Sequence, residues 1–159
     1  MTNEEEIRQK ISNKFNFLEG KIGISRVRRL TADVPQEKFE DILKYVIDEA
    51  GFIILCTITG LDEGENIGIV YHLARTDGIV LNIKIHVKKS APVVKTIMNY
   101  FNGSVIYERE LIDMLGVKVD GLPPGSRYPL PDDWPAGQYP LRKDWKAEML
   151  DKKEVKNNG

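Results

Sequence analysis

The sequence predicts an α+β fold: a mainly antiparallel four-stranded sheet with helices on one face, plus an extended proline-rich C-terminal arm. The expected elements run helix, strand, helix, three strands and two helices, without the repeated strand–helix–strand crossover that builds a parallel sheet. Six of the eight prolines fall within residues 117–145. Proline fixes φ and lacks a backbone donor, so this run is neither a helix nor a central strand.

The N-terminal segment predicts a helix followed by a strand. Residues 3–15 predict the helix, since Asn3 and Glu6 resemble a capping box and apolar residues recur one turn apart. Residues 22–34 predict the strand, in which the apolar residues near its end alternate. Arg26 and Arg28 share the apolar phase, so the strand contains a bulge or starts late.

Residues 35–50 give the clearest helical pattern in the chain. One apolar stripe follows helical spacing: Phe39, Ile42, Leu43, Val46, Ile47 and Ala50. Pro35 suits the first helical position, and Gly51 suits the residue just past the end. Residues 52–59 follow as a nearly unbroken apolar run, which predicts an interior strand covered on both faces, with Cys56 as a small core residue.

Two alternating strands, residues 67–73 and 79–87, predict a hairpin. A two-residue loop would place apolar residues opposite polar ones. A three-residue loop over residues 76–78, with Gly78 left-handed, places every apolar residue opposite another. We therefore expect the second register, in which residue 75 pairs with residue 79.

Two further helices are expected before the arm. Ser90 caps the first, which has Pro92 in its first turn and ends at Gly103. The second carries the charged residues 108–110 and is stopped by Gly116. The chain therefore divides into an α+β domain over residues 1–116, an arm over 117–146 and a disordered tail over 147–159.

The arm is rich in large apolar residues, unlike disordered segments. Its anchors are Leu122, Tyr128, Leu130, Trp134, Tyr139, Leu141 and Trp145. Fully extended it could span ~90 Å, whereas a body of this chain length is roughly 40 Å across. We expect the arm to reach a partner protein, with packing on its own domain as the alternative.

Composition excludes several classes of function. The net charge of −1 gives no basic excess for nucleic acid or an anionic membrane surface. No apolar run approaches the ~20 residues that span a bilayer, and the acidic N-terminus lacks the features of a signal peptide. The single cysteine suits a reducing cytosol and cannot form an internal disulfide. Membrane association would therefore depend on partners.

Candidate chemical groups are few. His72 and His86 lie on one sheet face but about 13 Å apart along the hairpin, too far to share a metal. Glu108, Glu110 and Asp113 could do acid–base work, could be a solvated surface, or could form a network that faces a partner or locks the arm.

Arginine is suited to such a network because its planar guanidinium binds carboxylates bidentately. Arg109 lies four residues before Asp113, within ion-pair reach on a helix. Arg142 of the arm offers a complementary charge to Glu108 or Glu110. We therefore expect an Arg109–Asp113 pair and a contact between Arg142 and one of the glutamates.

Several short motifs lie within residues 107–145. They are Glu108-Arg109-Glu110, Asp113-Met114, Gly116, Asp132-Asp133-Trp134 and Pro140-Leu141-Arg142-Lys143-Asp144. With them the chain resembles the C subunit of complex I (NADH-quinone oxidoreductase) and the matching small subunit of membrane-bound, energy-converting NiFe hydrogenases. Pro-Leu-Arg-Lys-Asp after Asp-Asp-Trp is the most specific part.

The resemblance implies a non-catalytic scaffold subunit without cofactors. Its partners would be a large catalytic, hydrogenase-like subunit and an iron–sulfur subunit, which would carry the NiFe site or iron–sulfur clusters. The protein would be cytoplasmic and peripheral on the inner face of the membrane. The implied interface residues are Glu108, Arg109, Glu110, Asp113, Tyr128, Asp132, Trp134, Leu141, Arg142, Lys143 and Asp144.

Departures from the complex I pattern favour the hydrogenase branch. Ile106 stands where tryptophan is usual, Leu115 where phenylalanine is usual, and Gly121-Leu122-Pro123 where Gly-His-Pro is usual. Three alternatives stay open: a quinone-reducing NADH dehydrogenase subunit of the same family, a stand-alone binding module with a self-packed arm, and a small enzyme that uses Glu108, Glu110 and Asp113.

Overall fold

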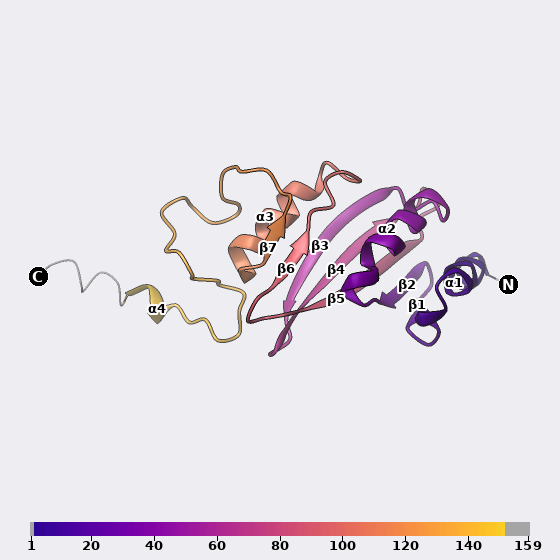
Figure 1. The fold of residues 1–159 in the computed structure, drawn as a ribbon, viewed down its shortest axis with the longest axis horizontal. Helices are drawn as coiled ribbons and strands as arrows, with labels where there is room; N and C mark the ends of the chain where they lie inside the picture. The colour runs from indigo at the N-terminus through magenta and orange to yellow at the C-terminus, as the bar shows by residue number, and fades with distance from the viewer. Residues whose placement is uncertain (1, 152–159) are drawn as a thin grey trace, which may run out of the picture. The chain divides into compact units, whose positions relative to one another are not determined.

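The computed structural model describes residues 2–151 and divides them into two compact units (Figure 1). Of the described residues, 2–59 and 68–87 form the first unit, and 60–67 and 88–151 form the second. The predicted tail over residues 147–159 lies mostly outside the described residues. Within it, Glu148–Asp151 form a short helix, α4.

A five-stranded sheet in the order β1-β2-β5-β4-β3 is the main feature of the fold. Its strands are β1 (Ile22–Arg26), β2 (Arg29–Asp33), β3 (Ile54–Asp62), β4 (Asn66–Ala74) and β5 (Val80–Lys88). The sheet is mixed, because β2 pairs antiparallel with β1 and parallel with β5. The α+β class is confirmed, and the sheet has one strand more than the four predicted.

The extra strand comes from residues 22–34, where the prediction of one strand was wrong. Here β1 and β2 form a tight hairpin, and Arg28 at its turn has φ of 59°. Arg26 and Arg28 fall in the apolar phase because Arg26 ends β1 and Arg28 lies in the turn. The register also shifts between Ile24 and Arg26, which is the irregularity that the alternative of a bulge anticipated.

The β4–β5 hairpin has the predicted connection. The backbone N–H of Arg75 donates to the carbonyl of Ile79 at 2.9 Å, and Gly78 has φ of 84°. Alternate apolar residues of both strands are buried, as is Ile79 just before β5: Ile67, Ile69, Tyr71, Leu73, Ile79, Leu81, Ile83, Ile85 and Val87. Matching of apolar residues across the strands therefore fixed the register.

Two helices belong to the first unit. The first, α1 (Asn3–Lys14), buries Ile7 and Ile11, and the 3-10 turn Asn16–Leu18 follows it. Its capping box uses Thr2 and Glu5, one residue earlier than predicted, because the Thr2 hydroxyl accepts from the backbone of Glu5.

The second helix, α2 (Phe39–Asp48), buries four residues of the predicted stripe: Phe39, Ile42, Leu43 and Val46. Ile47 is partly exposed, and Ala50 is buried just past the helix, which ends two residues earlier than predicted. It begins four residues later than predicted, since Pro35 leads into a 3-10 turn over Gln36–Lys38. The aromatic ring of Phe39 lies 4.3 Å from that of Tyr71 in β4, between ring centroids. This contact places α2 on the apolar face of the sheet.

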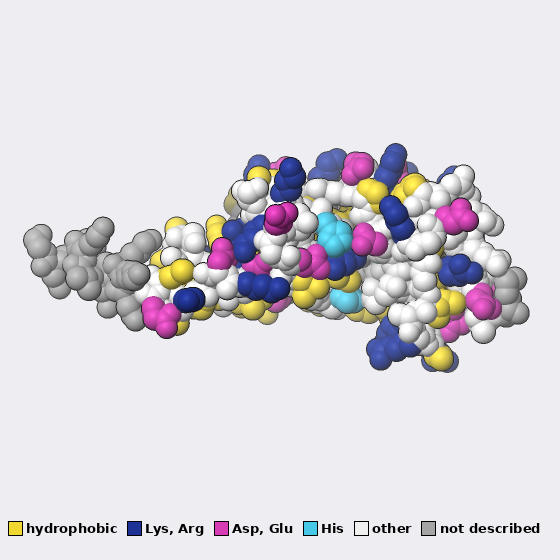
Figure 2. Space-filling view, turned by 90° about the horizontal axis from the view of Figure 1, so that it is seen from below, with side chains coloured by type: hydrophobic (Ala, Val, Ile, Leu, Met, Phe, Trp, Pro, Cys, Tyr) yellow, Lys and Arg dark blue, Asp and Glu magenta, His cyan; other side chains and the backbone are white. Residues whose placement is uncertain are grey.

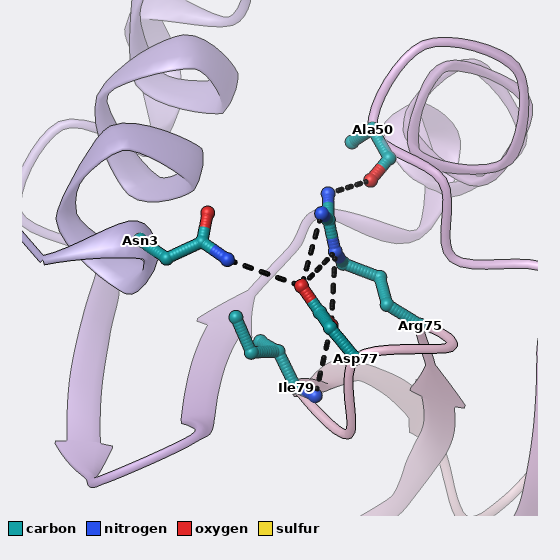
Figure 3. A network of polar contacts seen from close by, with 5 residues as sticks. All are labelled: Asn3, Ala50, Arg75, Asp77 and Ile79. Carbon is teal, nitrogen blue, oxygen red and sulfur yellow. Dashed lines mark hydrogen bonds and ion pairs between the residues drawn. The ribbon is translucent and has the colours of Figure 1, made fainter.

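A polar network fastens the β4–β5 turn to the helical segments (Figure 3). Asp77 accepts hydrogen bonds from Arg75, from the Asn3 amide and from the backbone N–H of Ile79. Arg75 also donates to the carbonyl of Ala50 at 2.7 Å. The hydrogen bond from Arg75 is the largest of the effects that lower the pKa of Asp77.

The predicted interior strand is an edge strand, so that prediction was wrong. β3 lies at the end of the sheet, and Ile53 and Ile54 are 57% and 44% exposed. Cys56 is exposed as well, and the prediction of a core cysteine fails with it. Apolar runs of this length indicate a strand but do not say how many of its faces are covered.

The second unit contains a two-stranded parallel sheet, β6 (Val93–Lys95) with β7 (Lys118–Asp120). The predicted helix over residues 90–103 is therefore wrong. β-branched Val93 and Val94 follow Pro92, whose carbonyl accepts a hydrogen bond from the N–H of Lys118. Pairing with β7 thus replaces helical hydrogen bonds, and it draws the first residues of the predicted arm into regular structure.

The remaining helix, α3 (Ser104–Leu115), carries the Glu-Arg-Glu motif. It begins at Ser104, without a side-chain cap, and ends at Gly116 with φ of 70°, as the glycine signal predicted. Its buried residues include Ser104, Glu108, Leu111, Asp113 and Leu115. Two carboxylates therefore lie on the buried side of this helix.

Candidate partner-docking surface of the second unit

Glu108 is buried and bound within its own unit. It is 2% exposed, and its carboxylate accepts hydrogen bonds from the backbone N–H of Ile97 at 2.7 Å and the Thr96 hydroxyl at 2.6 Å. A buried carboxylate needs such donors to offset its lost hydration. This carboxylate therefore fixes the segment between β6 and α3.

Arg109 does not form the expected ion pair with Asp113. Its two terminal nitrogens donate to the carbonyls of Ser126 at 2.9 Å and Pro123 at 3.1 Å. A Cβ added to Gly125 would lie 2.1 Å from this guanidinium. The glycine leaves room for the guanidinium, which binds two carbonyls of the proline-rich segment, the part of the predicted arm after β7 (residues 121–146).

Asp113 pairs instead with an arginine of the proline-rich segment. Its carboxylate, 4% exposed, accepts from Arg127 at 3.2 Å and from the backbone N–H of Leu130 at 3.2 Å. Arg127 also donates to the carbonyl of Trp134 at 2.7 Å. Spacing along the helix favoured Arg109 as the partner of Asp113, but the fold brings Arg127 to this buried carboxylate.

The predicted contact of Arg142 with Glu108 or Glu110 is also absent among the described residues. Arg142 donates to the carbonyl of Leu115 at 2.7 Å, and its guanidinium lies 4.7 Å from the ring centroid of Tyr139. The backbone N–H of Leu141 donates to the carbonyl of Met114 at 3.0 Å. These contacts cap the C-terminal end of α3, where cations are favoured.

Gly116 is required at this end for two reasons. Its φ of 70° disfavours a side chain, and a Cβ there would lie 2.5 Å from the ring of Tyr139.

We expect Gly116→Ala to lower the free energy of unfolding by about 2 kcal/mol, measured by chemical denaturation. Gly103→Ala is the matched control, because nothing lies within 4 Å of a Cβ there and its φ is −69°. Equal losses in the two variants would contradict this account.

Asp62 lies in an acidic stretch, residues 62–65, whose composition is typical of a solvated turn, yet it anchors the Pro-Leu-Arg-Lys-Asp motif. Its carboxylate accepts from Lys89 at 2.7 Å, from the backbone N–H of Lys143 at 2.8 Å and from that of Gly64 at 2.9 Å. Lys89 also donates to Asp144 at 3.0 Å. No sequence pattern signalled this cluster, because its members are far apart in the chain.

The electrostatics of the cluster favour its charged forms. Burial raises the pKa of Asp62, but the hydrogen bonds from Lys89, Gly64 and Lys143 outweigh it and lower the pKa from 3.8 to about 2. The hydrogen bond to Asp62 raises the pKa of Lys89, and the one from Lys89 lowers that of Asp144. The cluster is therefore fully ionised near neutral pH.

The two tryptophans of the proline-rich segment are held by one residue. The indole N–H of Trp134 donates to the backbone carbonyl of Gln138 at 2.9 Å, and that of Trp145 donates to the side-chain oxygen of Gln138 at 2.8 Å.

Other predicted interface residues reach the surface: Tyr128 is 46% and Leu141 50% exposed, and Asp132, Lys143 and Asp144 are exposed. Arg109, Glu110, Trp134 and Arg142 are partly exposed.

A cup of about 250 Å³ lies between α3, β7 and the first part of the proline-rich segment. Residues of all three contribute: Arg109, Ile112, Asp113, Val119, Leu122, Pro123, Pro124, Gly125, Ser126, Arg127 and Tyr128. It therefore combines three charged side chains with an apolar lining. Residue spacing in the sequence could not predict this cup, because the cup forms only when β7 pairs with β6.

The histidines form ordinary contacts on the sheet of the first unit. His72 hydrogen-bonds Thr59 at 3.0 Å and Asn82 at 2.8 Å, and His86 pairs with Asp33 at 3.1 Å. Within residues 2–151, no three His, Cys, Asp or Glu side chains gather in a way that could hold a metal. In the same range no helix has the length and apolar character needed to span a bilayer.

Charges are interspersed over the surface. Figure 2 shows Lys and Arg side chains alternating with Asp and Glu side chains, with apolar patches between them, on the face it presents. Such a mixture agrees with the net charge of −1. Neither sign of charge forms a broad continuous surface on this face.

A family model and individual related proteins indicate the same kind of subunit. A family model described as the 30 Kd subunit of respiratory-chain NADH dehydrogenase matches residues 32–149. The C subunit of the F(420)H(2) dehydrogenase of Methanosarcina mazei is 28% identical over 134 residues, which are 80% of this chain and 85% of that protein. The membrane-bound hydrogenase subunit beta of Pyrococcus furiosus is 29% identical over 170 aligned positions, covering 100% of this chain and 94% of that one.

The likeness to a solved structure extends over nearly the whole chain. That structure is described as the membrane-bound sulfane sulfur reductase, an archaeal respiratory membrane complex. A chain of that complex superposes with a TM-score of 0.81 at 28% identity, covering 98% of this chain and 92% of that one. The superposition extends the likeness beyond the span of the family model.

Proposed function

Because the chain belongs to the family of the 30-kDa subunit of respiratory-chain NADH dehydrogenase, we propose that it is a non-catalytic scaffold that docks a large catalytic subunit and an iron–sulfur subunit. At the coarser level it is the 30-kDa-type component of complex I-type respiratory oxidoreductases or membrane-bound hydrogenase complexes. The scaffold role concerns the second unit, whose proline-rich segment presents side chains outward.

One observation carries the proposal. Hydrogen bonds with other residues of its own unit hold the proline-rich segment in place, while large apolar side chains of the segment stay exposed. Arg109 and Asp113 hold its first part, and Asp62 holds the backbone of Lys143. Tyr128 and Leu141 are nevertheless about half exposed. A segment already ordered loses little conformational entropy when it binds, so its exposed anchors contribute more fully to affinity.

Two of the three carboxylates of α3, those of Glu108 and Asp113, have a structural role in this proposal. Glu108 and Asp113 are buried and accept hydrogen bonds from groups of their own unit. A general base must reach the proton that it abstracts, and these oxygens are already engaged. We therefore assign docking to the exposed members of the predicted set, chiefly Tyr128, Asp132, Leu141 and Lys143.

Point variants test this better than truncation. Cutting the chain after Gly116 would remove β7 and leave β6 without its partner, so loss of binding and loss of folding would coincide. We expect the double variant Tyr128→Ser with Leu141→Ser to weaken co-purification of the co-expressed large subunit by at least about tenfold, as removal of interface anchors does. Its thermal unfolding should stay close to that of the wild type.

The control for this experiment is Val27→Ser. Val27 belongs to the first unit and is 82% exposed, so its replacement removes exposed apolar surface without touching the proline-rich segment. Unchanged co-purification of the double variant, or an equal loss in the control, would contradict the proposed surface.

The finer assignment is to the hydrogenase branch, with the quinone-reducing complex as the alternative. The likeness to the Pyrococcus furiosus protein extends over the whole chain, whereas that to the C subunit of the NADH-quinone oxidoreductase of Moorella thermoacetica covers 64%. We expect the complex purified through this subunit to contain nickel in its large subunit, measured by elemental analysis. Iron without nickel would favour the quinone-reducing alternative.

A further inference from the structure

The cup of the second unit has a size suited to protein side chains. Its volume of about 250 Å³ falls below the roughly 300–1,000 Å³ of most small-molecule and cofactor sites. It is also much larger than the roughly 30 Å³ that one water occupies. One or two side chains of a partner protein would fill it.

The walls of the cup combine an apolar surface with arginines and a tyrosine. Ile112, Val119 and Leu122 supply aliphatic surface, and Tyr128 is 46% exposed at the cup. Tyrosine and arginine are enriched among the residues that contribute most to binding in protein interfaces. The lining therefore has the composition of a pocket that receives an anchor residue.

The charge of the cup is positive. Arg109 and Arg127 both line it, against the single carboxylate of Asp113. Arg127 is neutralised by Asp113 at 3.2 Å, whereas the hydrogen bonds of Arg109 go to uncharged carbonyls. Each guanidinium has five N–H donors. Arg109 uses two of them on its two carbonyls, and Arg127 uses two, on Asp113 and on the carbonyl of Trp134, so donors remain for a carboxylate.

We propose that the cup binds an aspartate or glutamate of the large catalytic subunit, with an adjacent aliphatic or aromatic side chain of that subunit on the apolar wall. The proposal rests on the proposed function and adds the chemistry of one contact within it. Arg109 is the recognising charge, since its positive charge has no carboxylate partner in the cup. Gly125 leaves room for its guanidinium, because a side chain there would displace it.

Photo-crosslinking identifies the occupant directly. In the co-expressed complex, Tyr128 is replaced by p-benzoylphenylalanine, which is aromatic and lines the same cup. Irradiation should yield an adduct with the large subunit, at a position within a few residues of an Asp or Glu. An adduct only with the iron–sulfur subunit, only with this chain, or with a basic stretch of the large subunit would overturn the proposal, as would no adduct.

Charge variants test the role of Arg109. We expect Arg109→Gln to weaken binding of the purified large subunit about tenfold and to reduce its salt dependence, while Arg109→Lys keeps the salt dependence because it keeps the charge. Lys118→Gln is the matched control, since Lys118 lies in the same unit and its side chain is 73% exposed. Thermal unfolding of each variant shows whether the proline-rich segment stays in place.

The outcomes separate this proposal from the one on which it rests. If the wild-type subunit binds the large subunit but Arg109→Gln binds equally well, the cup is not the contact and the scaffold role stands. If the wild-type subunit does not bind the large subunit at all, both proposals fail. Binding that Arg109→Gln and Lys118→Gln weaken equally would also overturn the role of the cup.

Discussion

Asp62→Ala should lower the free energy of unfolding by about 4 kcal/mol, in line with the loss of one partner of a buried ion pair. The side chain of Asp62 is 1% exposed, and that of Lys89 is 15% exposed. The variant leaves the ammonium group with only the exposed Asp144 as partner, and it leaves the N–H groups of Gly64 and Lys143 without their acceptor. Chemical denaturation of the purified chain measures the loss.

The same variant should release the Pro-Leu-Arg-Lys-Asp motif. Limited proteolysis should cleave Asp62→Ala near Arg142 and Lys143 faster than the wild type, because the backbone of Lys143 loses its anchor. Asp120→Asn is the matched control, since Asp120 pairs with Lys118 on an exposed surface and such pairs contribute less than about 1 kcal/mol. A loss in Asp62→Ala no larger than in this control would show that the cluster does not anchor the segment.

The pH dependence of stability gives an independent check on Asp62. Its folded pKa, about 2, lies below the ordinary value of 3.8, so its stabilising effect is complete above about pH 4 and is lost as the pH falls through about 2. Other carboxylates also titrate in this range. The test is therefore the difference between wild type and Asp62→Asn, which should shrink between pH 4 and pH 2.

Hydrophobic periodicity predicted those elements whose two faces differ in polarity. The β4–β5 hairpin was predicted with its loop length, because only one register matches apolar residues such as Tyr71 and Ile83 across the strands. Helix α2 was predicted from its stripe, although its first turn is a 3-10 turn. In both cases local pattern and tertiary burial agree.

The failures occurred where tertiary pairing overrides local pattern. Residues 93–95 form a strand only because β7, more than 20 residues later, lies beside them. The run from residue 52 was placed inside the sheet on its apolar composition, yet β3 is at the edge and exposes Ile54. Neither the pairing of β6 with β7 nor the edge position of β3 can be found from residue spacing along the chain.

Within the candidate site, the important residues were found but most of their partners were not. Arg109, Asp113 and Arg142 were singled out, and each contacts the proline-rich segment or the end of α3 rather than the expected charge. Charged side chains reach several partners at similar cost, and the fold selects among them. Asp62 was missed because its neighbours in sequence resemble a solvated turn.

Glu108→Ala tests whether the most buried carboxylate of α3 serves folding rather than docking. We expect a loss of about 3 kcal/mol in the free energy of unfolding, because the N–H of Ile97 and the hydroxyl of Thr96 lose their acceptor and a cavity remains. Glu108→Gln keeps the shape and one acceptor oxygen, so its loss should be clearly smaller. Denaturant titrations of both variants measure the difference.

Binding of the large subunit separates the two roles of Glu108. Under conditions where Glu108→Gln stays folded, its affinity for the large subunit should equal that of the wild type, because a side chain that is 2% exposed offers little surface to a partner. Arg109→Gln, one residue along the same helix, should lose affinity under the same conditions. If instead Glu108→Gln lost affinity without losing stability, this carboxylate would have to turn outward on assembly. Its hydrogen bonds to Thr96 and Ile97, between β6 and α3, would then be rearranged in the complex.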